Sequence, residues 1–184
     1  MFYPTKGGPE LIMNPESKIF KAQELFNQII DHLYQAAADK ETIGGMERSL
    51  WPWLLQLGRL LLQAFVEMIG TGDLGETLEI EGQNLKRLDR CHERRYVSVF
   101  GEIQISRTIY GSREKQKHEV VPLDAHLNLP AGDFSYLLQE WDQSFCVQSS
   151  FSQAKSSVQQ ILGIGQSVRS LEHMSRSIKN CVRN

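Results

Sequence analysis

A stretch in the middle of the chain alternates between apolar and polar side chains, a period typical of half-buried β-strands. It is RRYVSVFGEIQISRTIYG, residues 94–111, and the apolar positions that share one face of each run are Val97, Val99, Ile103, Ile105 and Ile109. Gly101 and Glu102 separate the two runs, and glycine tolerates the positive φ that a two-residue type II′ turn requires. The pattern therefore predicts an antiparallel β-hairpin with its turn at Gly101–Glu102.

Apolar residues recur at helical spacing before this stretch, and they predict two long amphipathic helices. Asn14–Pro15 suits an N-cap followed by the first helical position, so the first helix should begin there and end near Asp39. The paired glycines of ETIGGMERS (41–49) predict a break, and the second helix then covers 46–69 with a bend at Pro52. Two such helices in sequence predict an antiparallel hairpin.

The second helix has a wide apolar face, which motivates an interface role for the helical hairpin. Its members are Trp53, Leu54, Leu57, Leu61, Phe65 and Met68. Residues 50–69 are also nearly long enough to span a bilayer. However, polar side chains recur along the same segment as one stripe, at Gln56, Arg59, Gln63 and Glu67. This stripe is typical of a soluble amphipathic helix rather than of a membrane span.

Shorter helices are predicted after the β-hairpin. Residues 120–130, VVPLDAHLNLP, predict an extended piece, a proline turn and one helical turn that Asp124 caps. We expect Asp133 to cap the next helix, and a further helix should begin near Ser150. The glycines of the GIGQ segment then interrupt the helical period, and Ser167 can cap a last helix.

Together these patterns predict an α+β chain that is mostly α, with an N-terminal helical hairpin, a small antiparallel β ribbon and a C-terminal helical region. We expect a flexible arm over residues 1–13, the helical hairpin over 14–70, a linker with the β ribbon over 71–130, and the C-terminal helices over 131–184. The clearest linker is GTGDLGE (70–76), which contains three glycines.

The formal net charge is −2, but the charges are unevenly distributed along the chain. Residues 1–74 contain nine acidic and six basic residues, whereas residues 86–117 contain four acidic and nine basic ones. Residues 150–184 contain one acidic and five basic residues. Two basic segments are expected if particular faces of the protein meet phosphate groups, and ordinary solvated surface is the alternative.

The last two predicted helices, joined by a glycine turn, match the helix-turn-helix plan. Ala154 supplies a small side chain where these helices would meet. Four side chains on the outer face of the last helix can hydrogen-bond to base edges, and they are the predicted base-facing residues: Arg169, Ser170, His173 and Arg176. The alternative is a plain helical hairpin with a hydrated polar face.

Basic side chains before and within the β ribbon could follow a DNA backbone. The predicted phosphate contacts are Lys86, Arg87, Arg90, Arg94 and Arg95, together with Lys179 near the end of the sequence. Three bases of the following polar loop could contribute from the other end: Arg113, Lys115 and Lys117. The basic stretch has no cluster of aromatic side chains beside it, which disfavours single-stranded nucleic acid as the ligand. A charged, solvated face is the alternative.

The sequence lacks the usual signatures of catalysis and metal binding. It contains no GxSxG, P-loop or HExxH motif, and its aspartates do not mark the ends of strands in an α/β sheet. Asp124 lies near His126, but an aspartate after Pro-Leu is more often a helix cap. Three cysteines, Cys91, Cys146 and Cys181, have no CxxC or CxxH spacing, so we expect no zinc, no cofactor and reduced thiols. The first residues lack the regions of a signal peptide, so a cytoplasmic location is expected.

Several segments form an ordered set: RRYVSVFGEIQISRTIYG, PLDAHLNLP, FSYLL, SSFSQAKSSVQQILG and SVRSLEHM. The most specific of them contains Arg-Tyr-x-x-x-x-Gly-x-Ile-x-Ile-x-Arg (95–107), with Pro-Leu-Asp about fifteen residues further on. This set resembles the Kra-type family of bacterial insertion-sequence transposases, and the resemblance covers roughly residues 45–184.

The resemblance implies a helical start, a β ribbon, a helix-turn-helix-like region and then a catalytic RNase H-like domain whose Asp-Asp-Glu set binds two metal ions. The present sequence ends before such a domain, so we expect no enzyme activity from it and assign no catalytic residue. The implied function is binding of the double-stranded DNA ends of the element during transposition. The alternatives are a dimerising interaction module that holds a separate catalytic transposase chain, and a non-functional remnant.

Overall fold

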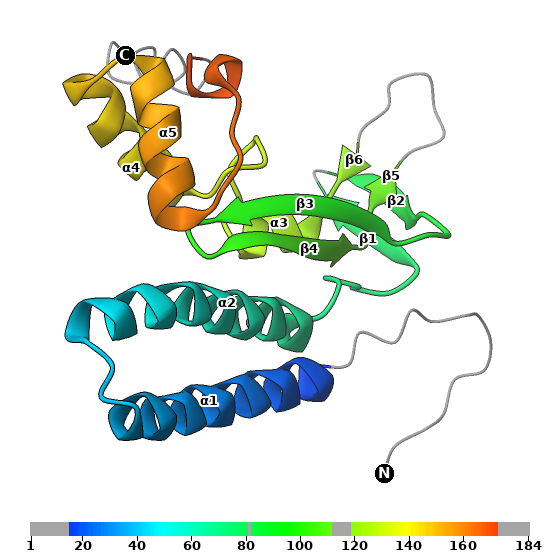
Figure 1. The fold of residues 1–184 in the computed structure, drawn as a ribbon. Coiled ribbons are helices and arrows are strands. Elements are labelled where there is room, and N and C mark those ends of the chain that lie inside the picture. Colours follow the sequence, from blue (N-terminus) through cyan, green and yellow to red (C-terminus); the bar gives the residue numbers. More distant parts are fainter. Residues whose placement is uncertain (1–14, 81, 112–118, 173–184) are drawn as a thin grey trace.

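The described part of the protein is a mixed α+β structure, with helices in its N-terminal and C-terminal parts and small antiparallel sheets between them (Figure 1). The computed structural model describes residues 15–80, 82–111 and 119–172. This architecture confirms the predicted fold class. The predicted flexible arm over residues 1–13 lies outside the described residues.

The N-terminal hairpin consists of α1, Pro15–Ala38, and α2, Ile43–Ile69, which lie antiparallel to each other (Figure 1). The side chains that α1 buries are all apolar, namely Ala22, Leu25, Ile29 and Ala36. At one edge of the α1–α2 interface, the His32 imidazole lies 2.9 Å from the Ser49 hydroxyl, and its ring centroid lies 5.2 Å from that of Trp53. Within the described residues, neither of these helices nor any other is apolar enough over a sufficient length to cross a bilayer.

Helix α2 begins earlier than the sequence predicts. Its first residue is Ile43 rather than residue 46, so the paired glycines lie in its first turn instead of breaking the helix. Thr42 caps this turn, because its hydroxyl accepts a hydrogen bond from the Gly45 N–H at 3.1 Å. A Cβ on Gly45 would collide with the Glu41 carboxylate, so glycine allows the close approach.

The alternating stretch forms the predicted hairpin of β3, His92–Ser98, and β4, Gly101–Arg107. All of the apolar positions predicted to face inward are buried, namely Val97, Val99, Ile103, Ile105 and Ile109. The turn, however, is Val99–Phe100 rather than Gly101–Glu102, because Ser98 pairs directly with Gly101. Gly101 has a φ of 109°, so its conformational freedom is used at the position after the turn.

A second sheet contains four short strands in the order β1-β2-β5-β6. They are β1, Thr77–Ile80; β2, Gln83–Arg87; β5, Tyr110–Gly111; and β6, Glu119–Val120. Strands β1 and β2 are not predicted from the sequence, since Leu85 is the only side chain in these two strands that is buried. Two strands with one buried residue carry little alternating signal.

Three named helices and one short helical segment follow. The named helices are α3, Pro122–His126; α4, Tyr136–Gln148; and α5, Phe151–Leu162. Residues 168–172 are also helical, and we call them the last helix.

Of the three predicted helix caps in this half only Ser167 is correct, and α5 begins next to Ser150 as predicted. The Ser150 hydroxyl caps α5 in a reciprocal capping box with Gln153, and the Ser167 hydroxyl accepts a hydrogen bond from Ser170 N–H at 3.0 Å. Asp124 is not a cap, because Val121 precedes α3 and Asp124 lies inside its first turn. Asp133 is not a cap either, since the Ser135 hydroxyl accepts from Leu138 N–H at 3.1 Å to begin α4.

The β3–β4 hairpin lies at the centre of the core, between α2 and the C-terminal helices (Figure 1). One cluster joins the hairpin tip to α4, α5 and the connection after α5, through Val97, Val99, Leu138, Val158, Leu162 and Ile164. Another joins the middle of the hairpin to α2 and α3, through Val66, Ile103, Ile105 and Leu123. The hairpin therefore connects the N-terminal and C-terminal helices in one packed structure.

Candidate nucleic-acid interface

The C-terminal helical pair is formed by α5 and the last helix, which are joined by the non-helical residues 163–167. Ala154 of α5 is fully buried in one cluster with Leu171 of the last helix, as the sequence analysis expected for a small side chain at the meeting point. Gly163 ends α5 in a left-handed conformation with a φ of 68°, which favours glycine. The connection is five residues long, slightly longer than a typical helix-turn-helix turn.

The predicted base-facing residues have different surroundings. Arg169 is exposed and takes part in no ion pair within the described residues. Ser170 is half-buried, and its hydroxyl lies 2.7 Å from that of Ser167 within the helix cap. His173 and Arg176 lie outside the described residues. Arg169 is therefore the predicted base-facing side chain that the described structure leaves free.

Arg94, a predicted phosphate contact, is held inside the fold. Its guanidinium pairs with Asp124 at 2.8 Å and donates to the carbonyl oxygens of Pro130 and Gly132. Only 11% of its side chain is exposed, and the same Asp124 oxygen also accepts from Arg107 at 2.6 Å. These contacts tie β3 and β4 to α3 and to the segment after it, which gives Arg94 a structural role.

Arg87 and Arg95 are exposed but paired. Arg87 lies 2.5 Å from Asp73, and Arg95 lies 2.7 Å from Glu102 and 3.5 Å from Asp133. The hydrogen bond to Glu102 raises the pKa of Arg95, with burial opposing the rise and Asp133 adding to it. Exposed ion pairs contribute little stability, so either arginine can exchange its carboxylate for a phosphate at small cost.

Lys86 and Arg90 are exposed and belong to no ion pair within residues 15–80, 82–111 and 119–172. Lys86 is on β2 and Arg90 follows it, so both belong to the region of the four-stranded sheet. Lys179 lies outside the described residues, as do Arg113, Lys115 and Lys117. Figure 1 places this sheet and the C-terminal helices at opposite ends of β3 and β4, so Lys86, Arg87 and Arg90 lie apart from those helices, whereas Arg95 lines a groove with Gly163 and Gly165 after α5.

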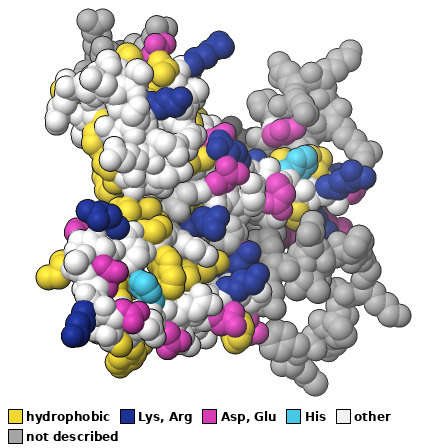
Figure 2. Space-filling view, in the orientation of Figure 1, with side chains coloured by type: hydrophobic (Ala, Val, Ile, Leu, Met, Phe, Trp, Pro, Cys, Tyr) yellow, Lys and Arg dark blue, Asp and Glu magenta, His cyan; other side chains and the backbone are white. Residues whose placement is uncertain are grey.

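The face drawn in Figure 2 agrees with this separation. Lysine and arginine side chains are spread over it and alternate with aspartate and glutamate, and they do not form one continuous basic patch there. A DNA duplex that used both predicted contact sets would therefore have to extend along the molecule. Such an arrangement favours a few phosphate contacts at separated points over a single electropositive cleft.

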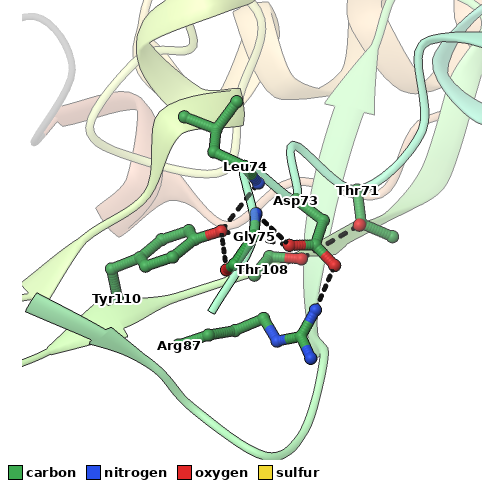
Figure 3. A network of polar contacts seen from close by, with 7 residues as sticks. All are labelled: Thr71, Asp73, Leu74, Gly75, Arg87, Thr108 and Tyr110. Carbon is green, nitrogen blue, oxygen red and sulfur yellow. Dashed lines mark hydrogen bonds and ion pairs between the residues drawn. The ribbon is translucent and has the colours of Figure 1, made fainter. Parts of the chain in front are cut away.

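The predicted linker at 70–76 is fastened to the sheet by a polar network around Tyr110 (Figure 3). The buried Tyr110 hydroxyl donates to Asp73 or to the Gly75 carbonyl, at 3.1 and 2.9 Å, and accepts from Leu74 N–H at 2.7 Å. Burial raises the pKa of Tyr110, with the Leu74 N–H opposing the rise and Asp73 adding to it. Burial also acts to raise the pKa of Asp73, but hydrogen bonds from Gly75, Tyr110 and Arg87 lower it overall. The network therefore fixes the segment 70–76 to the sheet.

A buried carboxyl lies beside the C-terminal helical pair. Asp142 of α4 and Gln166 in the connection after α5 are 2% and 4% exposed, and their polar side-chain atoms have no hydrogen-bond partner within the described residues. Burial raises the pKa of Asp142 to about 6, and the nearby Gln166 amide offsets part of that rise. Partial burial raises the pKa of the half-buried Tyr96, and a hydrogen bond with Ser135 opposes this rise.

A groove of about 950 Å³ lies between α2, the tip of the β3–β4 hairpin and the end of α5. Its basic side chains, Arg48, Arg59 and Arg95, come from distant parts of the sequence, which is why sequence reasoning did not find it. Trp51 bounds the groove and donates its indole N–H to the Ile161 carbonyl at 2.6 Å. Glu47 and Glu102 also line it, so its charge is mixed.

Comparisons with protein-family models, with curated proteins and with solved structures found no match to this chain. Among the residues that the structure describes, no three His, Cys, Asp or Glu side chains lie close enough together to hold a metal ion. Evidence for function therefore comes from the geometry of the described residues.

Proposed function

We propose that this chain binds double-stranded DNA through its C-terminal helical pair, as the end-recognition part of a Kra-type insertion-sequence transposase. The observation that carries the proposal is the packing of Ala154 against the cluster that contains Leu171. This packing holds two serine-capped helices across a short connection and leaves Arg169 exposed on the second of them. An exposed arginine near the start of the second helix is placed as in helix-turn-helix proteins, which insert that part of the helix into the major groove.

Phosphate contacts in this proposal come first from Lys86 and Arg90, which are exposed and free of ion pairs within the described residues. Arg87 and Arg95 add contacts by exchanging a carboxylate partner for a phosphate. Arg94 acts indirectly, because it fixes the hairpin that connects these residues to the C-terminal pair. The sequence-predicted contacts His173, Arg176 and Lys179 remain part of the proposal.

The proposal can be tested by measuring binding to the terminal DNA of the flanking element, with scrambled DNA of the same length as the control. Log affinity should fall with log salt by roughly 0.9 for each neutralised phosphate. Arg169→Glu should reduce the preference for terminal DNA by about 10- to 100-fold, the value of one bidentate base contact. Lys86→Glu should weaken binding to both DNAs equally and lower the salt slope by about 1.

Lys21→Glu is the matched control, since Lys21 is exposed on α1, far from the C-terminal pair in the fold. It makes the same charge change as Lys86→Glu and should leave both affinities nearly unchanged. Equal, weak binding of wild-type protein to terminal and scrambled DNA would contradict end recognition. If the Arg169→Glu variant bound both DNAs like the wild type, the last helix would not be the recognition element.

A further inference from the structure

Helix α1 carries two rows of mainly apolar side chains, of which only one is buried. The buried row contains Ala22, Leu25, Ile29 and Ala36. A second row runs beside it with alternating steps of four and three residues, and its members are Ile19, Gln23, Phe26, Ile30, Leu33 and Ala37. Phe26 is 52% exposed and Leu33 is 39% exposed. Apart from the one glutamine, this row has the seven-residue repeat of apolar a and d positions by which helices pack against other helices.

Helix α2 has a matching exposed row. It contains Leu54, Leu61, Phe65 and Met68, which are 43%, 51%, 50% and 58% exposed. Of the apolar face predicted for this helix, Trp53 and Leu57 are partly buried, and Trp53 stacks near His32 at the α1–α2 interface. The remaining four residues therefore have no packing role within α1–α2 that would account for their apolar character.

Both exposed rows lie along the same edge of the helical hairpin. The contact between His32 and Ser49 marks one edge of the α1–α2 interface. At 100° per residue, the exposed row of α1 lies on the other side of the buried row from His32. The exposed row of α2 likewise lies on the other side of the buried Ala64 from Ser49. The two exposed rows thus form one surface, which we call the outer apolar edge.

We propose that the outer apolar edge is the interface at which a second copy of this chain binds, so that two α1–α2 hairpins pack as a four-helix bundle. Six large side chains on this edge, Phe26, Leu33, Leu54, Leu61, Phe65 and Met68, are roughly half exposed. Side chains of this size offer on the order of 600–700 Å² together, close to the ~800 Å² per partner of a standard interface.

A second copy fits this edge better than a different protein would. The two rows contain no charged side chain of either sign, so nothing in them selects a partner of complementary charge. A twofold axis places the edge against itself, and both copies then supply the same seven-residue repeat. Gln23, the one polar member, has an amide that both donates and accepts hydrogen bonds, so it can pair with an identical amide. This inference does not depend on the proposed DNA binding.

The test is sedimentation equilibrium of the full chain without DNA, over a concentration series. Wild-type protein should be a dimer at micromolar concentration. Phe26→Glu and Leu61→Glu should each raise the dissociation constant by about 100-fold, because dimerisation would bury a carboxylate without a partner. Phe26→Gln, which adds a polar group without charge, should raise it by about 10-fold.

Gln28→Glu is the matched control, because Gln28 is exposed on the polar side of α1 and the change introduces the same charge. It should leave the dissociation constant unchanged, and circular dichroism should show equal helix content in all of the variants. If the wild-type protein were still a monomer at about 100 μM, the proposal would be overturned, and a different partner would have to cover the outer apolar edge. A dimer that Phe26→Glu and Leu61→Glu leave intact would also overturn it.

Discussion

The two helical pairs of this protein present opposite kinds of outer surface. Along its outer apolar edge, the α1–α2 pair exposes large apolar side chains such as Phe26, Leu61 and Phe65. The exposed residues of α5 before Ile161 are instead serine, glutamine and lysine. Removing apolar surface from water lowers the free energy, which favours association with another apolar surface. Hydroxyl, amide and ammonium groups instead bind well to a partner that stays hydrated, such as DNA. This difference is the one expected if, as proposed, the first pair binds a second copy of the chain and the second pair binds DNA.

The β3–β4 hairpin lies between these two surfaces and belongs to the core of both. Val97 packs with α4 and α5, while Ile103 packs with α2 and α3. The hairpin thereby holds the two helical pairs in fixed positions without making them one functional unit. If the contrast between the pairs is correct, changes in one of them should affect its own partner and leave the other partner bound.

Leu171→Ala should have the largest effect on the C-terminal pair. Leu171 is 1% exposed and packs in one cluster with Ala154, so its truncation should destabilise the last helix by about 2–5 kcal/mol. DNA affinity should then fall to the non-specific level, while sedimentation still shows a dimer. Leu171→Met, which conserves volume, is the control and should cost less than about 1.5 kcal/mol. Loss of the dimer in Leu171→Ala would show that the two pairs depend on each other.

Asp142→Asn should have a smaller effect, with a distinctive pH dependence. Because burial raises the folded-state pKa of Asp142 to about 6 from its usual 3.8, the protonated carboxyl stabilises the fold. That stabilisation is fully present at pH values below 3.8, the usual pKa of the carboxyl, and it is lost as pH rises through the folded-state pKa of about 6. Asparagine stays neutral, so Asp142→Asn should stabilise the protein by about 2–3 kcal/mol at pH 7.5 and leave it nearly unchanged at pH 4.

Urea unfolding at several pH values measures this difference. Asp31→Asn is the control, since Asp31 is exposed on α1 and should show no such pH-dependent gain. If Asp142→Asn destabilised the protein at pH 7.5, the carboxylate would have a favourable charged role in the fold. If Asp142→Asn stabilises the protein as expected, the buried pair of Asp142 and Gln166 is a site where the sequence gives up stability.

Local patterns predicted the parts of the fold whose determinants are close in sequence. Helix α1, the buried face of β3–β4, the start of α5 near Ser150 and the cap at Ser167 each depend on residues within one or two turns. Such features follow from helical period, strand alternation and capping chemistry. The Ala154 contact was also predictable, because a small residue at a helix crossing has a clear steric reason.

The features that could not be predicted depend on contacts between residues that are far apart in the sequence. Asp124 looked like a cap, but its carboxylate pairs with Arg94 and Arg107, which are 30 and 17 residues away in sequence. The groove beside the hairpin tip combines arginines of α2 and β3, and no local pattern connects them. For the same reason, sequence grouped Arg94 with the other basic residues of the stretch, although the fold buries it and gives it carboxylate and carbonyl partners.

The smallest predicted effects come from removing one helix cap in each helical pair. Ser150→Ala removes a reciprocal capping box at α5, and Thr42→Ala removes the single cap of α2, so each should cost about 1 kcal/mol. Only Ser150→Ala should also weaken DNA binding, because α5 supports the last helix, and only Thr42→Ala should weaken dimerisation. Hydrogen exchange should show faster opening confined to the altered pair. Equal effects of both variants on DNA affinity would mean that the two pairs respond as a single cooperative unit, and their contrasting surfaces would then not mark separate functions.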